Sequence, residues 1–342
     1  MFPTSSLRRK TLYGVGLLVA SWVVAGCETT VDIPAPNDTP RLALVYTLSN
    51  QPAPTGLGQP KVSETRWPYV SASRRISEQG PSGRSDATIE VLDARGQVVE
   101  SFTSTSTIFG VPIENTPGYY TPTRSFVGEP GQTYTLRASV PGLDAVESAL
   151  TLPAAARIDT ASFVRLLPPS RPLAVVEGRL SIVVPDNPAT TDYYIAYARL
   201  LDQQGRLWGY LRQDKANDDG DLGLNFTDRF QLSESVRTGS KDETYVYADT
   251  NRNGQTLTLS SNVFGYLGAS VPAGSLPPEP AYVEVIVSSV TRDTYLFYQA
   301  LGRYYSAKDN PFAEPAPLVS NIRNGYGLFS GATDVTYRFP LP

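Results

Sequence analysis

Cys27 is the only cysteine of the 342-residue chain, and its flanks are those of a lipid-attachment site. It follows Val24-Ala25-Gly26, and the two small residues before it let a signal peptidase bind the extended backbone closely. At such a site the thiol takes a diacylglycerol, the chain is cut before the cysteine, and the new amino terminus is acylated. The sequence therefore predicts that Cys27 is lipidated and that the mature chain begins there.

The residues before Cys27 have the layout of a secretory signal. Arg8, Arg9 and Lys10 form a basic region, and residues 11–24 carry no charge and are mostly apolar. This apolar run is too short to span a bilayer comfortably, which favours a cleaved signal peptide over residues 1–26. The alternatives are an ordinary signal peptide followed by an unrelated cysteine, and an uncleaved anchor. Several acyl chains, each contributing about 0.8 kcal/mol per buried methylene, would hold the protein stably on a membrane.

Composition excludes several classes of chemistry. The chain has no histidine, so a Ser-His-Asp triad and the usual histidine-bearing zinc site are excluded. Removing residues 1–26 takes away three of the 29 basic residues and none of the 33 acidic ones, and this acidic balance argues against nucleic-acid binding. We predict no catalytic residue and no enzymatic activity. The chemistry that stays open is that of carboxylates, tyrosine and lysine, or the binding of hard cations by oxygen ligands.

One polar run has the spacing of a calcium-binding loop. Asp249, Asn251 and Asn253 offer oxygens at alternate positions, and Gly254 allows a sharp turn, as in the first half of an EF-hand loop. Ser260 stands where the bidentate carboxylate should be, so the motif is incomplete.

Two other interpretations of these polar runs stay open. In the first, the Asn-Gly dipeptide at 253–254 is simply the tip of a hairpin. In the second, calcium binds the other acidic run, residues 217–221. Apart from this calcium hypothesis, the sequence predicts no cofactor.

Two tryptophans are candidate ligand contacts, because exposed aromatic rings can stack on sugars. Trp67 lies in the Pro-, Gly- and Ser-rich segment 50–83, and Trp208 follows a predicted turn at 202–205. The alternative for both is a half-buried position on a sheet. Segment 50–83 itself is either a functional loop or a further strand with an irregular flank.

Hydrophobic alternation predicts an all-β fold built from two β-sandwich domains. Residues 27–40 form a short acidic tether. Residues 41–153 alternate in short strands with turn dipeptides between them, which is typical of an immunoglobulin- or transthyretin-like sandwich. After a predicted boundary at Pro153 to Ala156, strand patterns resume over the second domain, residues 157–342.

The end of the second domain carries the one substantial helix that the mature sequence predicts. A strand over 281–290 precedes apolar residues at helical spacing, which indicate a helix over about 293–306 with Asp293 as its cap. We expect Asn310 and Asn321 to bind backbone groups between helix and sheet. The glycines in Gly325-Tyr326-Gly327 indicate a close approach of two backbones.

These last residues resemble a known family. The order of a strand, an aromatic helix, Asn-Pro-Phe-Ala-Glu-Pro (310–315), Ser-Asn-Ile (320–322) and Gly-Tyr-Gly-Leu-Phe (325–329), behind a lipid-attachment site and a sandwich, is similar to the domain of unknown function 4249 family. Its members are lipoproteins of Bacteroidota-type envelopes, frequently encoded beside TonB-dependent outer-membrane receptors. The resemblance implies an outer-membrane location, on either face, and a receptor as partner. It implies no catalytic residue.

Three functions compete. The first is a non-catalytic accessory or substrate-capture partner of a TonB-dependent receptor, attached to the membrane through its lipid. The second is a surface adhesin or glycan-binding module. The third is a hydrolase with paired carboxylates, which requires a concave pocket holding two acids about 5–10 Å apart.

Overall fold

The computed structural model describes residues 39–52, 66–73, 83–108, 111–112, 117–169, 174, 176–214, 232–233, 244–265, 279–308 and 317–342. Residues 40–342 form one compact unit. Cys27, the signal peptide, the tether up to residue 38, Asn310 and the acidic run at 217–221 lie outside the described residues. None of the helices in the described part of the chain is long and apolar enough to span a bilayer.

The described strands confirm an all-β fold with two main sheets and one helix near the C-terminus. The smaller sheet has five strands in the order β7-β4-β3-β8-β9, all antiparallel. Its strands are β3 (Thr88–Leu92), β4 (Val98–Ser104), β7 (Tyr120–Pro122), β8 (Thr133–Ser139) and β9 (Val146–Thr151). A separate short hairpin joins β5 (Thr107–Ile108) and β6 (Val111–Pro112).

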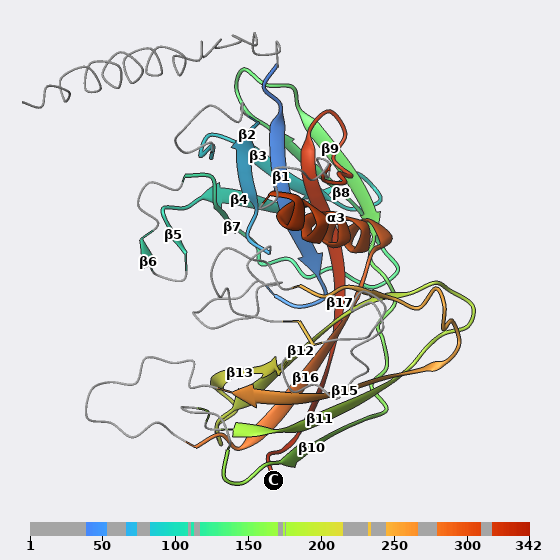
Figure 1. The fold of residues 1–342 in the computed structure, drawn as a ribbon. Coiled ribbons are helices and arrows are strands. Elements are labelled where there is room, and N and C mark those ends of the chain that lie inside the picture. Colours follow the sequence, from blue (N-terminus) through green and yellow to red (C-terminus); the bar gives the residue numbers. More distant parts are fainter. Residues whose placement is uncertain are drawn as a thin grey trace, which may run out of the picture. The chain divides into compact units, whose positions relative to one another are not determined.

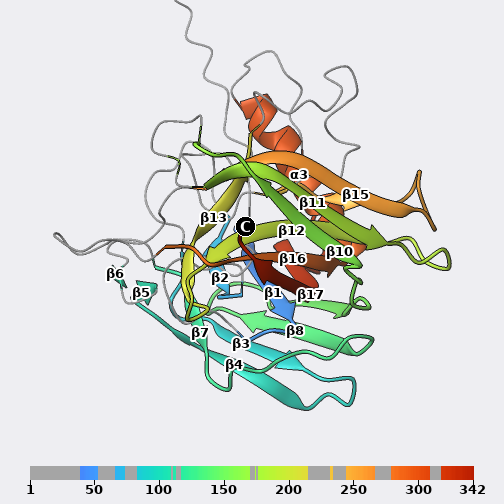
Figure 2. The ribbon, with the colours of Figure 1, turned by 90° about the horizontal axis from the view of Figure 1, so that it is seen from below.

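The larger sheet has ten strands among the described residues. Nine of them follow in the order β10-β11-β15-β13-β12-β16-β17-β1-β2 (Figure 1), and β14 pairs with β12. They are β1 (Leu42–Ser49), β2 (Tyr69–Ala72), β10 (Thr160–Arg165), β11 (Val176–Pro185), β12 (Tyr193–Leu201), β13 (Leu207–Gln213), β14 (Tyr247–Ala248), β15 (Thr256–Gly265), β16 (Tyr282–Val290) and β17 (Tyr326–Pro340). Figure 2 shows the five-stranded sheet on one side of β1 and the strands β10, β11 and β15 on the other.

The first hydrophobic core lies between the five-stranded sheet and the strands β1, β2 and β17. Alternate residues of β1, including Leu42, Leu44 and Tyr46, are buried there, as the period of two along a strand requires. The Tyr46 ring lies 5.0 Å from that of Phe102 and 5.9 Å from that of Phe329. This core combines residues of the predicted first sandwich, 41–153, with Ile322 and Phe329 from the second half of the chain.

The second core lies between residues of β10, β11, β13 and β15 and those of β12, β16 and β17. The sheet passes between these layers through β13, whose first residues pair with β12 and whose last residues pair with β15. Trp208 on β13 is 2% exposed and belongs to this core.

β17 contributes to both cores. It pairs in parallel with β1 from Tyr326 to Ala332 and antiparallel with β16 from Ala332 to Pro340. Phe329 is buried in the first core, and Val335 and Tyr337 pack on the second. The predicted boundary at Pro153 to Ala156 separates most residues of the first core from those of the second. β17, from the second half of the chain, contributes residues to both cores, so the division into two domains stays a prediction.

The predicted helix is confirmed as α3 (Arg292–Lys308), which packs beside β17 and β12 (Figure 1). Its cap is Thr291, whose Oγ1 accepts a hydrogen bond from the Thr294 amide at 3.4 Å. The expected cap, Asp293, lies in the first turn instead, where its negative charge interacts favourably with the positive end of the helix dipole. Thr294 Oγ1 also lies 2.8 Å from Ser330 Oγ, a contact that joins α3 to β17.

The start of β17 is fixed by the two features that the sequence predicts there. Gly327 has a φ of +115°, and a Cβ at this position would lie 2.0 Å from the carbonyl oxygen of Leu44. Asn321 accepts from the Phe329 amide at 2.9 Å and donates to the Phe329 carbonyl at 2.8 Å. The expected binding of Asn321 to backbone groups is therefore confirmed, as is the close approach of two backbones.

Candidate functional site

Three carboxylates meet at one end of the large sheet. Asp186 follows β11, Asp192 precedes β12, and Asp249 follows β14. One oxygen of each carboxylate lies within 4.8 Å of the corresponding oxygens of the other two. We call this group the acidic cluster.

Strand pairing brings two members of the acidic cluster together. Tyr193 pairs with Ala248, so the next residues outward, Asp192 and Asp249, stand opposite each other. The amide of Asp192 donates to Asp249 Oδ2 at 2.9 Å, and the amide of Asp249 donates to the Asp192 carbonyl at 3.2 Å. These bonds fix the Asp249 side chain relative to the start of β12.

Asp186 is held by donors on both of its oxygens. The hydroxyl of Tyr194 donates to Oδ1 at 2.7 Å, and the amide of Gly254 donates to Oδ2 at 2.8 Å. Gly254 has a φ of +76°, and a Cβ there would lie 2.8 Å from Pro188 Cβ. A glycine is therefore needed where the turn at 249–255 packs on the connection between β11 and β12.

Within the described part of the chain, no neighbouring cation balances the charges of the acidic cluster. No arginine or lysine of the described chain forms an ion pair with any of the three carboxylates. Burial raises the pKa of Asp249; the hydrogen bond from the Asp192 amide opposes this rise, and the charges of Asp186 and Asp192 add to it. Burial, and then the bond to Asp186, likewise raise the pKa of Tyr194.

Only one of the three residues predicted to bind calcium belongs to the acidic cluster. Asp249 is fully buried within it. Asn251 is exposed, and the Asn253 side-chain amide donates to the Thr190 carbonyl at 2.9 Å. Asn253 thus ties the turn to the β11–β12 connection.

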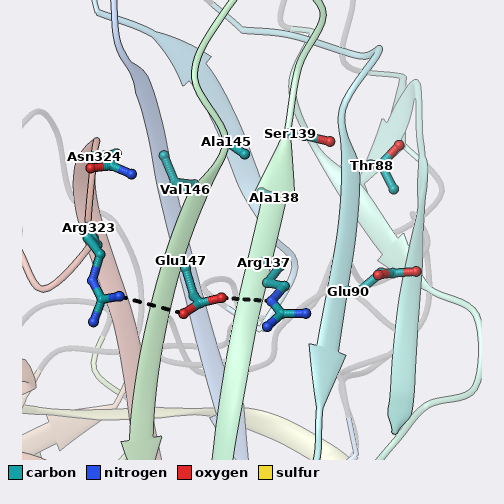
Figure 3. A pocket seen from close by; sticks show the side chains of 10 residues that line it. All are labelled: Thr88, Glu90, Arg137, Ala138, Ser139, Ala145, Val146, Glu147, Arg323 and Asn324. Carbon is teal, nitrogen blue, oxygen red and sulfur yellow. Dashed lines mark hydrogen bonds and ion pairs between the residues drawn. The ribbon is translucent and has the colours of Figure 1, made fainter. Parts of the chain in front are cut away.

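A second candidate is a shallow depression of about 440 Å³ on the outer face of the five-stranded sheet (Figure 3). Its floor carries a row of alternating charges: Glu90 on β3, Arg137 on β8, Glu147 on β9, and Arg323 beside β9. Arg137 Nε donates to Glu147 Oε2 at 2.7 Å, and Arg323 Nη1 lies 3.9 Å from Glu147 Oε1. We call these four residues the charged row.

The charged row suits binding better than proton transfer. Both oxygens of Glu147 face guanidinium groups, and Arg137 stands between the two carboxylates (Figure 3). A general acid must hold a proton and a general base must face its substrate, and neither role fits a carboxylate already engaged by two arginines. The two arginine side chains are 57% and 78% exposed, so their outer faces are available to a partner.

The predicted ligand contacts lie in different surroundings. Trp208 is buried in the second core and has no exposed face on which a sugar ring could stack. Trp67 is half-buried, next to Tyr69, whose ring lies 4.8 Å from that of Tyr119. Cys27 lies outside the described residues, so its lipidation stays a prediction.

Comparison with known proteins supplies a family. The family model described as "Domain of unknown function (DUF4249)" matches residues 58–338. The matched range includes the acidic cluster and the charged row. The chain matches none of the curated proteins.

Proposed function

The chain belongs to the domain of unknown function 4249 family, as its motifs predicted, and from this premise we propose that it is a lipid-anchored outer-membrane protein. In this proposal it acts without catalysis, as an accessory or substrate-capture partner of a TonB-dependent receptor. The lipid holds the folded body at the membrane, and the body offers a surface to the receptor or to its nutrient.

The observation that carries the proposal is the sequence Val24-Ala25-Gly26-Cys27 behind a basic and then apolar segment. Glu28, Asp32 and Asp38 follow Cys27, and acidic residues just after the lipid cysteine suit a lipoprotein sent to the outer membrane.

The charged row supports a binding role. Its exposed arginines alternate with carboxylates across four adjacent segments of chain, and such a pattern fixes the register of a partner of complementary charge. The hydrolase hypothesis receives no support from this depression, because the arginines occupy the space beside its acids (Figure 3).

Metabolic labelling tests the anchor. Cells expressing the full chain receive a fatty acid carrying an alkyne, and the purified protein is examined for the label. We expect the native chain to be labelled and to sediment with membranes, and Cys27→Ser to lose both properties. Thr29→Ser, a conservative change two residues away, is the matched control and should keep them. An unlabelled native chain would refute the anchor and the location that depends on it.

Crosslinking in intact cells tests the partner. A photoreactive amino acid replaces Arg323 in the charged row, and captured proteins are identified by mass spectrometry. We expect capture of a TonB-dependent receptor, and less capture when Arg137→Glu is added. The same probe at Leu167, which is 68% exposed near the edge strand β10, is the control. If the receptor is absent from both samples, the partnership is wrong, and if both capture it equally, the charged row is not the contact.

Glycan binding is the second candidate, and the half-buried ring pair of Tyr69 and Tyr119, together with the half-buried Trp67 two residues before Tyr69, favours it. Adjacent rings offer faces that can stack on a sugar. Binding to a glycan array that falls at least tenfold in Trp67→Ala, and persists in cells lacking the receptor, would favour this function. Phe126→Leu, a partly buried residue that packs against the first core, is the control for general loosening of the fold.

A further inference from the structure

Asp249 differs from other buried acids of this chain. Its side chain is fully buried, and its Oδ1 has no hydrogen-bond partner within the described part of the protein. Buried polar atoms are almost always hydrogen-bonded, because leaving one without a partner costs the full loss of its hydration. The orphaned oxygen belongs to the acidic cluster, where two further carboxylates add negative charge.

Three other buried acids show how the same fold normally satisfies a carboxylate. Glu284 is paired with the guanidinium groups of Arg199 and Arg338. Asp202 accepts bonds from two backbone amides and from Arg206. Glu100 accepts five hydrogen bonds from residues 101–126. Among the residues that the structure describes, no arginine or lysine pairs with the three carboxylates of the acidic cluster, so their charge calls for a bound positive ion.

We propose that Asp186, Asp192 and Asp249 bind a calcium ion. Calcium takes six to eight oxygens at about 2.3–2.6 Å, so oxygens that share one ion lie at most about 5 Å apart. The three carboxylate oxygens meet this limit. Water and backbone carbonyls would complete the coordination, as they do in most calcium sites.

The surrounding hydrogen bonds orient the proposed ligands. Thr190 Oγ1 donates to Asp192 Oδ2 at 2.8 Å, which leaves Oδ1 for an ion, and the Asp192 amide holds Asp249 Oδ2, which leaves its Oδ1. Tyr194 and Gly254 each take one lone pair of Asp186, whose oxygens keep others. Donors of this kind fix the direction of a ligand and strengthen metal binding.

The ligand set differs from the loop that the sequence indicates. A calcium loop takes its oxygens from one run of about 12 residues, whereas these carboxylates come from three connections of the large sheet. The ion would therefore join the ends of β11, β12 and β14. This inference does not rest on the proposed receptor partnership, since binding of the ion is a property of the purified chain alone.

Calcium titration of the purified full chain in detergent, after treatment with a chelator, tests the site. We expect a dissociation constant of about 10⁻⁴ M, in the range of extracellular calcium modules. At calcium about 100-fold above this value, the unfolding midpoint should rise by about 5 °C. Terbium should also bind and emit when tyrosine is excited, because Tyr194 donates to Asp186.

The decisive variant is Asp249→Asn. It should weaken calcium binding at least tenfold, and without calcium it should unfold at the same temperature as the native chain or higher, because a neutral amide relieves the crowding of charges. If Asp249 had a purely structural role, Asp249→Asn would unfold at a lower temperature without calcium and would keep its calcium affinity. Asp202→Asn is the matched control: it removes a buried carboxylate at the other end of β12, about 30 Å away, and should keep the calcium affinity. Asp192→Asn is the second variant, should Asp249→Asn not fold.

Three results would overturn the proposal. The first is that the native chain neither binds calcium nor becomes more stable at calcium concentrations up to about 10 mM. In that case a proton shared between the carboxylates, and not an ion, would offset the charge of the acidic cluster. The second is unchanged calcium affinity in Asp249→Asn and Asp192→Asn, which would move the ion to another loop such as residues 217–221. The third is an equal response to magnesium and calcium, which would reject the assignment of the ion.

Discussion

Replacement of Glu100 by glutamine provides a strict test of how the first sandwich is held together. Glu100 on β4 is 1% exposed, and no described residue forms an ion pair with it. Its Oε1 accepts from the amides of Ser101, Thr123 and Arg124 at 2.9–3.1 Å and from the Thr123 hydroxyl at 3.3 Å. Its Oε2 accepts from the amide of Phe126 at 2.7 Å. Backbone amides therefore stabilise this buried charge.

The expected cost of Glu100→Gln follows from this geometry. The glutamine carbonyl can take the place of Oε1, but its NH₂ group then faces the Phe126 amide, so two donors meet and neither has an acceptor. A hydrogen bond to a charged group contributes about 1.5–3 kcal/mol, and the four remaining bonds weaken when the charge is removed. We expect the free energy of unfolding to fall by about 2–4 kcal/mol.

Urea unfolding of the full chain, followed by tryptophan fluorescence, measures this change. The matched control is Glu147→Gln on the same sheet, whose side chain is 39% exposed and paired with exposed arginines. Exposed pairs of this kind contribute at most about 1 kcal/mol. Suppose that the two variants have the same slope of unfolding free energy against urea concentration as the native chain. If Glu100→Gln then lowers the free energy of unfolding no more than Glu147→Gln does, the proposed role of the five donors is wrong.

Three further predictions concern the packing around β1 and β17. Arg66 Nη2 lies 2.5 Å from Asp334 Oδ2 with both side chains 9% exposed, so Asp334→Asn should leave a buried cation and lower the free energy of unfolding by about 3–5 kcal/mol in the same urea assay. Asn321→Ala removes both hydrogen bonds to the Phe329 backbone; we expect a loss of about 2 kcal/mol and faster hydrogen exchange at the Phe329 amide. Burial, and then the charge of Glu100, raise the pKa of Tyr46 above its ordinary value of 10.0, so above pH 10 the unfolded chain loses this proton before the folded chain does. The free energy of unfolding should therefore fall as pH rises above about 10. Between about pH 9 and pH 11, Tyr46→Phe should lose less of its free energy of unfolding than the native chain does; an equal loss in both would refute the role of Tyr46.

Much of the fold could be predicted because its determinants are local. The dense apolar run from Leu42 to Leu48, the turns at Gly96 and Gly131, and the helical spacing of Phe297 and Ala300 are each complete within a short run of sequence. The parallel pairing of β1 with β17 could not be predicted, because nearly the whole chain separates the two strands and no local pattern records which distant strand will be a neighbour.

The acidic cluster was predicted in part, for a related reason. The sequence marks Asp249 because it begins a polar run of calcium-loop type. Asp186 and Asp192 lack such a motif. Asp192 reaches Asp249 through the register of Tyr193 with Ala248, and Asp186 reaches the acidic cluster through the pairing of β11 with β15, which sets Pro185 opposite Thr256. One sequence feature could have indicated Asp186 and Asp192: each acid lies directly at the end of a strand rich in apolar residues, at the start or the end of the connection between β11 and β12.

The residues that carry the family resemblance have structural roles, and this limits what membership can say about function. Gly327 lets β17 approach β1, Asn321 holds the backbone of Phe329, and Phe329 fills the first core. A slip of one residue in β17 would turn its side chains to the opposite face in both cores at once, so this segment must be specified closely in any chain with this fold. The segment therefore identifies the architecture and leaves the ligand open. The residues proposed to bind a ligand lie elsewhere, in the acidic cluster, in the charged row and at Trp67, and we expect variation there to change binding without changing the fold.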